Sequence, residues 1–253
     1  MKTVNIDYGR IIENAKTGIR RSAVFMGLGV NAADNSEAQK YQLIEETRMQ
    51  LLPSDVSSEV IREWKLEFRS WVVAGGFREL VEHLCLFLDS IYDVSRMIQE
   101  THNLKDKKKF ERAGLDKKIK LLEAQIGMRY IHGDALASFY PLRNCLIHRL
   151  GVVSAKDVSD SGTLDFSYLR MKLVFTAKSG SVIDVPDDEA FSSDEDGLIG
   201  MKFHIHKLSF KKGERIDLSP RTLTEILFFS DLCVRAYAKQ AIEFAQANGV
   251  VMK

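Results

Sequence analysis

The segment Arg143-Asn144-Cys145-Leu146-Ile147-His148 combines side chains that could cleave a phosphodiester bond in RNA. Cleavage without a metal requires a base for the ribose 2′-hydroxyl, a cation for the phosphate and an acid for the leaving oxygen. Histidine, whose unperturbed pKa is about 6.5, can accept or donate a proton near neutral pH. Arginine binds two phosphate oxygens at once and stays charged, and asparagine can orient either group or bind the phosphate itself. The segment therefore predicts catalytic roles for Arg143, His148 and Asn144.

The spacing of these residues limits how they can act within one helix. Asn144 and His148 are four positions apart and share a helical face, whereas Arg143 and His148 are five apart. At about 3.6 residues per turn, five positions correspond to a rotation of about 140°, so one straight helix does not aim both side chains at one phosphate. Three solutions remain open: the long arginine side chain wraps around, the helix deforms, or two copies of the segment meet across a dimer axis.

The same residues also have a purely structural interpretation. Arg143 could pair with a carboxylate inside a helical bundle, and His148 could find hydrogen-bond partners near a helix end. Asn144 could brace the neighbouring backbone, as short polar side chains often do. We favour the catalytic interpretation because a proton-transfer group and a phosphate-binding group fall together in one short segment.

The most basic stretch of the chain runs from Lys105 to Lys120. Lysines there could contact the phosphates of an RNA backbone, although a solvated, charged helix face is the other interpretation. Its one aromatic residue, Phe110, is not enough to form a platform on which single-stranded bases stack. Together with the arginine that follows the motif, the candidate RNA-binding residues are Arg149, Lys107, Lys108 and Lys109.

Composition limits the class of protein. The net charge of +1 creates no overall field that attracts nucleic acid or membranes, so any such contact must be local. No apolar run reaches the roughly 18 residues needed to span a bilayer. The three cysteines, Cys85, Cys145 and Cys233, lie far apart and indicate a reducing compartment rather than a disulfide framework. We therefore expect a cytoplasmic protein with no membrane contact and no cofactor.

Apolar periodicity predicts helices in the first half of the chain. One helix spans residues 56–74 and ends at a break or kink at Gly75-Gly76. A second helix, with apolar residues at three- and four-residue spacing, starts at Phe77 and continues to about Glu100. A further helix could span residues 37–52, inside an N-terminal segment whose glycines leave no sustained period.

Capping signals predict the later helices. The segment from Ala135 to Leu150 contains Pro141, which suits a first helical turn, so we expect two helices with a kink between them. Gly151 is placed to cap the second of these helices. The last helix begins at Ser219-Pro220, a good N-cap followed by proline, and ends at Asn248-Gly249.

A β element precedes that last helix. Residues 169–176 and 201–210 alternate and are rich in β-formers, which predicts two strands separated by an acidic loop over 184–196. His204 and His206 lie two apart on the second strand, a spacing that suits a metal. No third ligand is apparent, so we expect no metal site.

The motif resembles the signature of the HEPN superfamily (higher eukaryote and prokaryote nucleotide-binding). That signature is an arginine, usually followed by a polar residue, with a histidine four to six residues beyond, here Arg143-Asn144-x-x-x-His148. The resemblance covers roughly residues 77–151 and, weakly, 200–247. It implies a metal-independent endoribonuclease that acts as a homodimer with both residues at the subunit cleft, often a toxin–antitoxin or anti-phage defence effector. The alternative that it implies is a non-catalytic module for dimerisation or for binding a nucleotide or partner.

The expected fold class is mainly α (α+β): a HEPN-like helical bundle with a small antiparallel β element inserted before the C-terminal helix. We expect residues 1–55 to form an N-terminal helical extension of unknown role. Residues 56–253 would then form the HEPN-like domain, with the β insertion at about 164–218.

Overall fold

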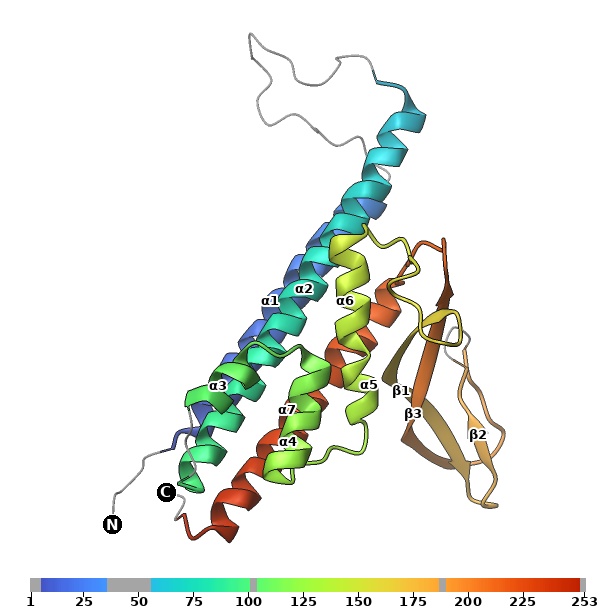
Figure 1. The fold of residues 1–253 in the computed structure, drawn as a ribbon. Coiled ribbons are helices and arrows are strands. Elements are labelled where there is room, and N and C mark those ends of the chain that lie inside the picture. The colour runs from blue at the N-terminus through green and yellow to red at the C-terminus, as the bar shows by residue number, and fades with distance from the viewer. Residues whose placement is uncertain (1–5, 36–55, 101–103, 187–189, 251–253) are drawn as a thin grey trace.

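The computed structural model describes residues 6–35, 56–100, 104–186 and 190–250, so the predicted helix over 37–52 lies outside the described residues. Within these ranges the elements follow one another along the chain (Figure 1) as α1 (Tyr8–Asp34), α2 (Ser58–Ile98), α3 (Leu104–Glu111), α4 (Leu115–Ile126), α5 (Gly133–Ala137), α6 (Phe139–His148), β1 (Thr163–Ala177), β2 (Val182–Asp184), β3 (Gly197–Lys211) and α7 (Pro220–Ala247).

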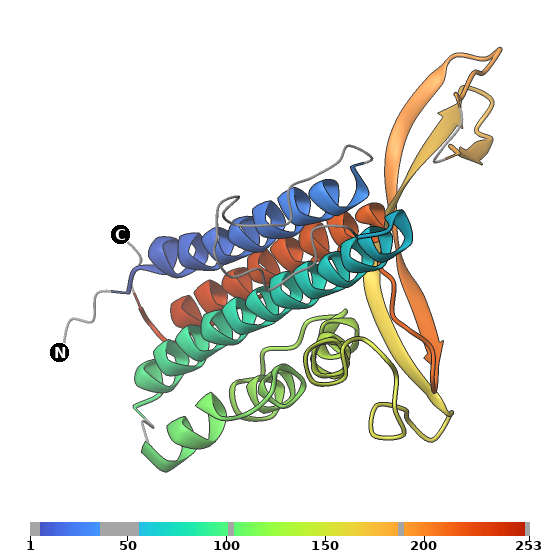
Figure 2. The same cartoon turned by 90° about the horizontal axis from the view of Figure 1, so that it is seen from above.

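Three long helices form the body of the molecule. Helices α1, α2 and α7 run side by side, and the shorter helices α3 to α6 pack along one side of α2 (Figures 1 and 2). The three strands form an antiparallel sheet in the order β2-β1-β3. The prediction of a mainly helical fold with a small antiparallel sheet before the last helix is confirmed. No helix in the described ranges is long and apolar enough to cross a membrane.

The predicted break at Gly75-Gly76 is wrong, because α2 runs through both glycines without interruption. The missing side chains serve helix packing instead. A Cβ on Gly76 would lie 2.2 Å from the side chain of Met26 on α1. In the same way, a Cβ on Gly29 of α1 would lie 2.4 Å from Val72 of α2. These glycines therefore let α1 and α2 approach closely, and side chains of α1 join the common hydrophobic core.

The two helices expected around Pro141 are present, and they meet at Ser138. Pro141 lies in the first turn of α6, where its missing N–H is not needed. The Ser138 hydroxyl donates to the carbonyl of Ala135 at 2.6 Å and accepts the N–H of Ser167 at 2.9 Å. Because Ser167 belongs to β1, this junction ties the start of α6 to the sheet.

An aromatic cluster lies where α2, α6, β1 and α7 meet. Phe139 of α6 is fully buried, and its ring centroid lies 5.5 Å from Phe77, 5.2 Å from Phe166 and 5.8 Å from Phe229. Burying a phenylalanine contributes about 1.5–3 kcal/mol to folding, and each ring here comes from a different element. The cluster therefore fixes the position of α6 relative to the rest of the bundle.

The C-terminal helix and the strands follow the expectations from the sequence. Ser219 accepts the N–H of Thr222 at 3.1 Å, Pro220 is the first residue of α7, and Asn248 follows its last turn. Strands β1 and β3 pair over fifteen residues each, which extends the predicted strands at both ends. The far half of this hairpin reaches beyond the bundle (Figure 2).

Candidate functional site

Helix α6 turns its apolar side toward the core and presents the motif on its other sides. Leu142, Cys145 and Leu146 are buried in the core, so the residues between Leu142 and Cys145, and those after Leu146, lie nearer the surface. Arg143 and Asn144 are half-buried, and His148 is exposed as the last residue of the helix. Burial raises the pKa of the Cys145 thiol to about 11, so it is not a reactive thiolate at neutral pH.

Arg143 is held by polar contacts on both sides. Its guanidinium lies 3.3 Å from a carboxylate oxygen of Glu82 on α2 and donates to the Asn144 amide oxygen at 3.1 Å. Glu82 also pairs with Arg78, one turn earlier on α2, at 3.2 Å. The side chain of Arg143 keeps 19% of its surface exposed. The structure thus brings Arg143 and Asn144 together, in contact with a carboxylate that two arginines share.

His148 is free of such contacts. Within the described ranges its imidazole makes no hydrogen bond or ion pair. Both ring nitrogens are therefore available to solvent or to a ligand, as proton transfer requires. Helix α6 is regular from Phe139 to His148, so the rotation of about 140° between Arg143 and His148 applies to the folded protein. One subunit presents these two side chains in different directions.

Arg149 anchors the loop that follows α6. Its guanidinium forms a two-point ion pair with the carboxylate of Asp157, whose side chain is 1% exposed. Asp157 also accepts the N–H of Ser154 at 2.8 Å and its hydroxyl at 2.7 Å. Burial alone would raise the pKa of Asp157, but the hydrogen bonds from Arg149 and Ser154 lower it below the usual value. This candidate RNA-binding arginine is thus occupied within its own subunit.

The turn after Arg149 exposes an apolar residue beside the motif. Leu150 adopts a left-handed conformation with φ of +52°, and Gly151 follows with φ of +73°. The Gly151 N–H donates to the carbonyl of Cys145 at 3.2 Å, which ends the helix as the sequence predicted. Residues other than glycine rarely adopt a positive φ, because that conformation costs energy. The loop after α6, which the Arg149–Asp157 pair anchors, therefore imposes this conformation on Leu150.

A groove of about 1230 Å³ opens beside the C-terminal end of α6. Helix α6 and its turn contribute Ile147 and Leu150, while α1 and α2 form the other walls. Two aromatic side chains are exposed there, Trp71 at 66% and Phe25 at 45%. The cationic side chains that line the groove are Arg20, Arg21, Arg78 and Arg215.

The charges of this groove are unevenly paired. Arg21 lies 3.3 Å from Glu79, and Arg78 is paired with Glu82. Arg20 and Arg215 have no ion pair among the residues that the structure describes. Arginine forks suit phosphates, and exposed aromatic faces suit nucleobases. The sequence predicts a helix over residues 56–74, which contains Trp71, but it does not predict the groove, because the groove forms only when α1, α2 and α6 come together.

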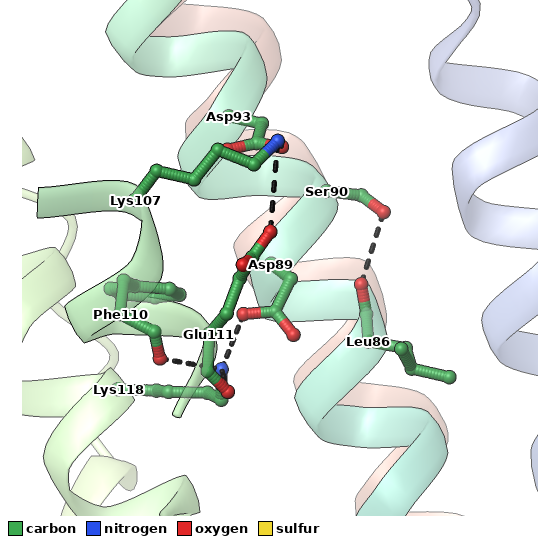
Figure 3. Close-up of polar contacts among 8 residues, drawn as sticks. All are labelled: Leu86, Asp89, Ser90, Asp93, Lys107, Phe110, Glu111 and Lys118. Atoms are coloured by element: carbon green, nitrogen blue, oxygen red, sulfur yellow. Dashed lines mark hydrogen bonds and ion pairs between the residues drawn. The ribbon is translucent and has the colours of Figure 1, made fainter. Parts of the chain in front are cut away.

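The lysines predicted to bind RNA fall into two kinds. Lys107 faces α2, where it pairs with Asp93 and lies 3.7 Å from Glu111 (Figure 3). The hydrogen bond to Asp93 raises the pKa of Lys107. Lys108 and Lys109 instead point to solvent.

A second inward lysine, Lys118, is the most buried charge in this region, with 1% of its side chain exposed. Figure 3 shows its ammonium between Asp89 of α2 and the end of α3. It pairs with Asp89, donates to the carbonyl of Phe110 at 2.7 Å, and lies 4.7 Å from the centre of the Phe110 ring. Burial raises the pKa of Asp89, an effect that Lys118 partly offsets. A buried charge needs such partners.

The two histidines of β3 do not form a recognisable metal centre. Their rings are perpendicular with centroids 6.5 Å apart. Within the described ranges no three histidine, cysteine or acidic side chains gather closely enough to hold a metal ion.

No family model, curated protein or solved structure matches this chain. The functional interpretation therefore rests on the residues of α6 and on the groove beside it.

Proposed function

We propose that this protein is a metal-independent endoribonuclease of the HEPN type that acts as a cytoplasmic homodimer. The observation that carries the proposal is the exposed imidazole of His148 at the end of α6, which makes no hydrogen bond or ion pair with the residues that the structure describes. Its chain neighbour Ile147 lines a groove with exposed aromatic rings and arginines. Arg143 is the phosphate-binding residue of the motif, and Asn144, in contact with it, is the positioning residue. No cofactor takes part in the proposed reaction.

The reaction uses the ribose 2′-hydroxyl as the nucleophile. His148 removes the proton from that hydroxyl, and the 2′-oxygen then attacks the adjacent phosphorus. The bond from phosphorus to the 5′-oxygen breaks, and the imidazolium returns its proton to that oxygen. Arg143 stabilises the charge that develops on the phosphate. The products are a 2′,3′-cyclic phosphate and a 5′-hydroxyl.

A second copy of the chain completes the site. Because Arg143 and His148 project in directions about 140° apart on α6, the histidine of one subunit and the arginine of its partner contact the same phosphate. Homodimers most often have twofold symmetry, so the dimer would carry two such sites. RNA enters as a single strand along the groove, with bases on Trp71 and Phe25 and phosphates on Arg20 and Arg215.

Cleavage of a mixed pool of fluorescent RNA in the presence of EDTA tests this proposal. The wild-type protein should cleave, with cyclic phosphate ends, whereas His148→Ala and Arg143→Ala should not. Absence of cleavage by folded, dimeric wild-type protein would overturn it. In bacteria, expression of the wild type but not of His148→Ala should arrest growth, as expected of a toxin or anti-phage defence effector that an antitoxin or defence partner restrains.

The contact between Arg143 and Glu82 favours a second candidate function, a non-catalytic HEPN-like module for dimerisation or for binding a nucleotide or partner. In that role the arginine only stabilises the bundle. The variant Glu82→Gln distinguishes the nuclease from the binding module, because it removes the negative charge that pairs with Arg143. A nuclease should keep or increase its activity in this variant. A binding module should show no RNA cleavage in either form.

A further inference from the structure

The lysines over 107–120, the part of the lysine-rich run whose side chains the structure describes, divide into an inward and an outward set. The inward lysines, Lys107 and Lys118, are neutralised by Asp93 and Asp89 of α2. The outward set consists of five exposed side chains from the end of α3 and from α4, namely Lys108, Lys109, Arg112, Lys117 and Lys120. None of these five forms an ion pair among the residues that the structure describes.

The outward set lines one shallow depression of about 740 Å³. Its remaining lining residues are Ala113 and Leu121, so no carboxylate belongs to it. Five like charges in one place repel one another at close range, and none of the described carboxylates forms an ion pair with them. The depression shares no residue with the groove beside α6. Helices α3 and α4, whose residues line the depression, lie away from the C-terminal end of α6 (Figure 1).

The corner between α3 and α4 that carries these charges is held firmly. Lys118 donates to the carbonyls of Phe110 and Glu111 at 2.7 and 3.1 Å, and so joins α4 to the end of α3. The turn also packs tightly on α6, because a Cβ on Gly114 would lie 2.5 Å from the ring of Tyr140. The five cations are therefore displayed by a rigid scaffold, which lowers the entropy lost when a ligand binds.

We propose that this depression is an RNA-binding site that contacts the phosphate backbone of folded, double-helical RNA. Lysine is depleted in protein–protein interfaces, whereas lysine and arginine supply most phosphate contacts to nucleic acids. No aromatic residue lines the depression, and Phe110, the aromatic residue of the lysine-rich run, is buried against Lys118. The lining therefore offers no ring on which bases could stack. The site therefore reads charge and shape rather than sequence. This inference holds whether or not α6 cleaves RNA.

The test compares charge reversals in and outside the depression, all in a His148→Ala background so that RNA stays intact. Binding of a fluorescent RNA hairpin is measured by anisotropy over a range of salt concentrations. Lys117→Glu combined with Lys120→Glu should weaken binding roughly tenfold or more, and should reduce the slope of log affinity against log salt by about 1.5. The matched control, Lys156→Glu with Lys212→Glu, makes the same charge change at exposed lysines elsewhere and should leave both quantities near the wild-type values.

Two results would overturn the inference. Equal weakening by the control pair would mean that only the overall charge matters. Unchanged binding in the Lys117/Lys120 pair would mean that RNA is held elsewhere. Poly-glutamate at matched charge serves as a competitor for an acidic protein partner. If it displaces the hairpin as well as unlabelled RNA does, the site selects acidic chains in general and the assignment to RNA is wrong.

Discussion

The groove beside α6 and the depression on α3 and α4 are both basic, but they are built from different side chains. The groove carries arginines together with exposed Trp71 and Phe25, and Ile147, next to His148 in the chain, contributes to its wall. The depression carries four lysines and one arginine with no exposed aromatic ring. Arginine and aromatic faces can hold a base and a phosphate in defined positions, whereas lysines act as point charges. Under the two proposals, chemistry and backbone binding would therefore take place at separate surfaces of the molecule.

His148→Ala should separate the two regions most strongly. Removing a general acid–base group typically lowers the rate by about 10²–10⁴. RNA cleavage should fall by that factor, while binding of a double-helical RNA at the depression should not change. A parallel loss of hairpin binding would show that the two regions do not act independently.

Lys118→Ala tests whether the depression depends on its inward lysine. The change removes a buried ammonium with its hydrogen bonds and leaves the half-buried Asp89 without its partner, so the free energy of unfolding should fall by about 3 kcal/mol. Its neighbour Lys117 is exposed, and Lys117→Ala should change stability by less than about 0.5 kcal/mol. Urea unfolding followed by circular dichroism measures both. Similar values for the two variants would contradict the division into inward and outward lysines.

Trp71→Ala should weaken the binding of single-stranded RNA but not the binding of an RNA hairpin. Loss of one stacked base costs about 1–3 kcal/mol, so affinity for a single strand should fall by roughly tenfold or more, while hairpin affinity stays constant. Phe203→Ala is the control, since Phe203 is an exposed aromatic residue on β3, away from the groove. If both variants bind the single strand equally, Trp71 is not part of a base-stacking surface.

The loop after α6 should show a pH-dependent contribution from Asp157. Because the folded protein lowers the pKa of Asp157, its ion pair with Arg149 stabilises the fold above the unfolded pKa, about 3.9. That contribution disappears as the pH falls through the lower folded value. At neutral pH, Asp157→Asn should therefore be about 2 kcal/mol less stable than wild type. Urea titrations should show the difference shrinking below about pH 4; a constant difference would contradict the assignment.

The sequence predicted those elements whose signals are local. Ser219-Pro220 marks the start of α7, and Pro141 marks two helices that meet nearby. The strands were recognised because alternation is also a local pattern. The sequence does not predict the bounds of α1, because its glycines look like interruptions, although two of them, Gly18 and Gly29, face α2. The predicted break at Gly75-Gly76 is wrong for the same reason. The side chains that occupy the space of the missing Cβ atoms belong to α1, which is distant in the sequence.

The sequence nominates candidate residues for the site, but it does not reveal their surroundings. The motif itself identified Arg143, Asn144 and His148, yet the contact with Glu82 depends on how α6 packs against α2. Likewise, the charge of the lysine run is visible in the sequence. Which lysines face inward depends on the relative orientation of two helices and on carboxylates from a third.

Mixing two inactive variants tests the central claim, that one subunit supplies His148 and the other Arg143 to the same RNA cleavage site. His148→Ala and Arg143→Ala homodimers should each be inactive. After dissociation and random reassociation, half of the dimers are mixed and each mixed dimer has one intact site, so about a quarter of the wild-type cleavage should return. A mixture that stays inactive, although mixed dimers have formed and the wild type cleaves, would contradict a shared site.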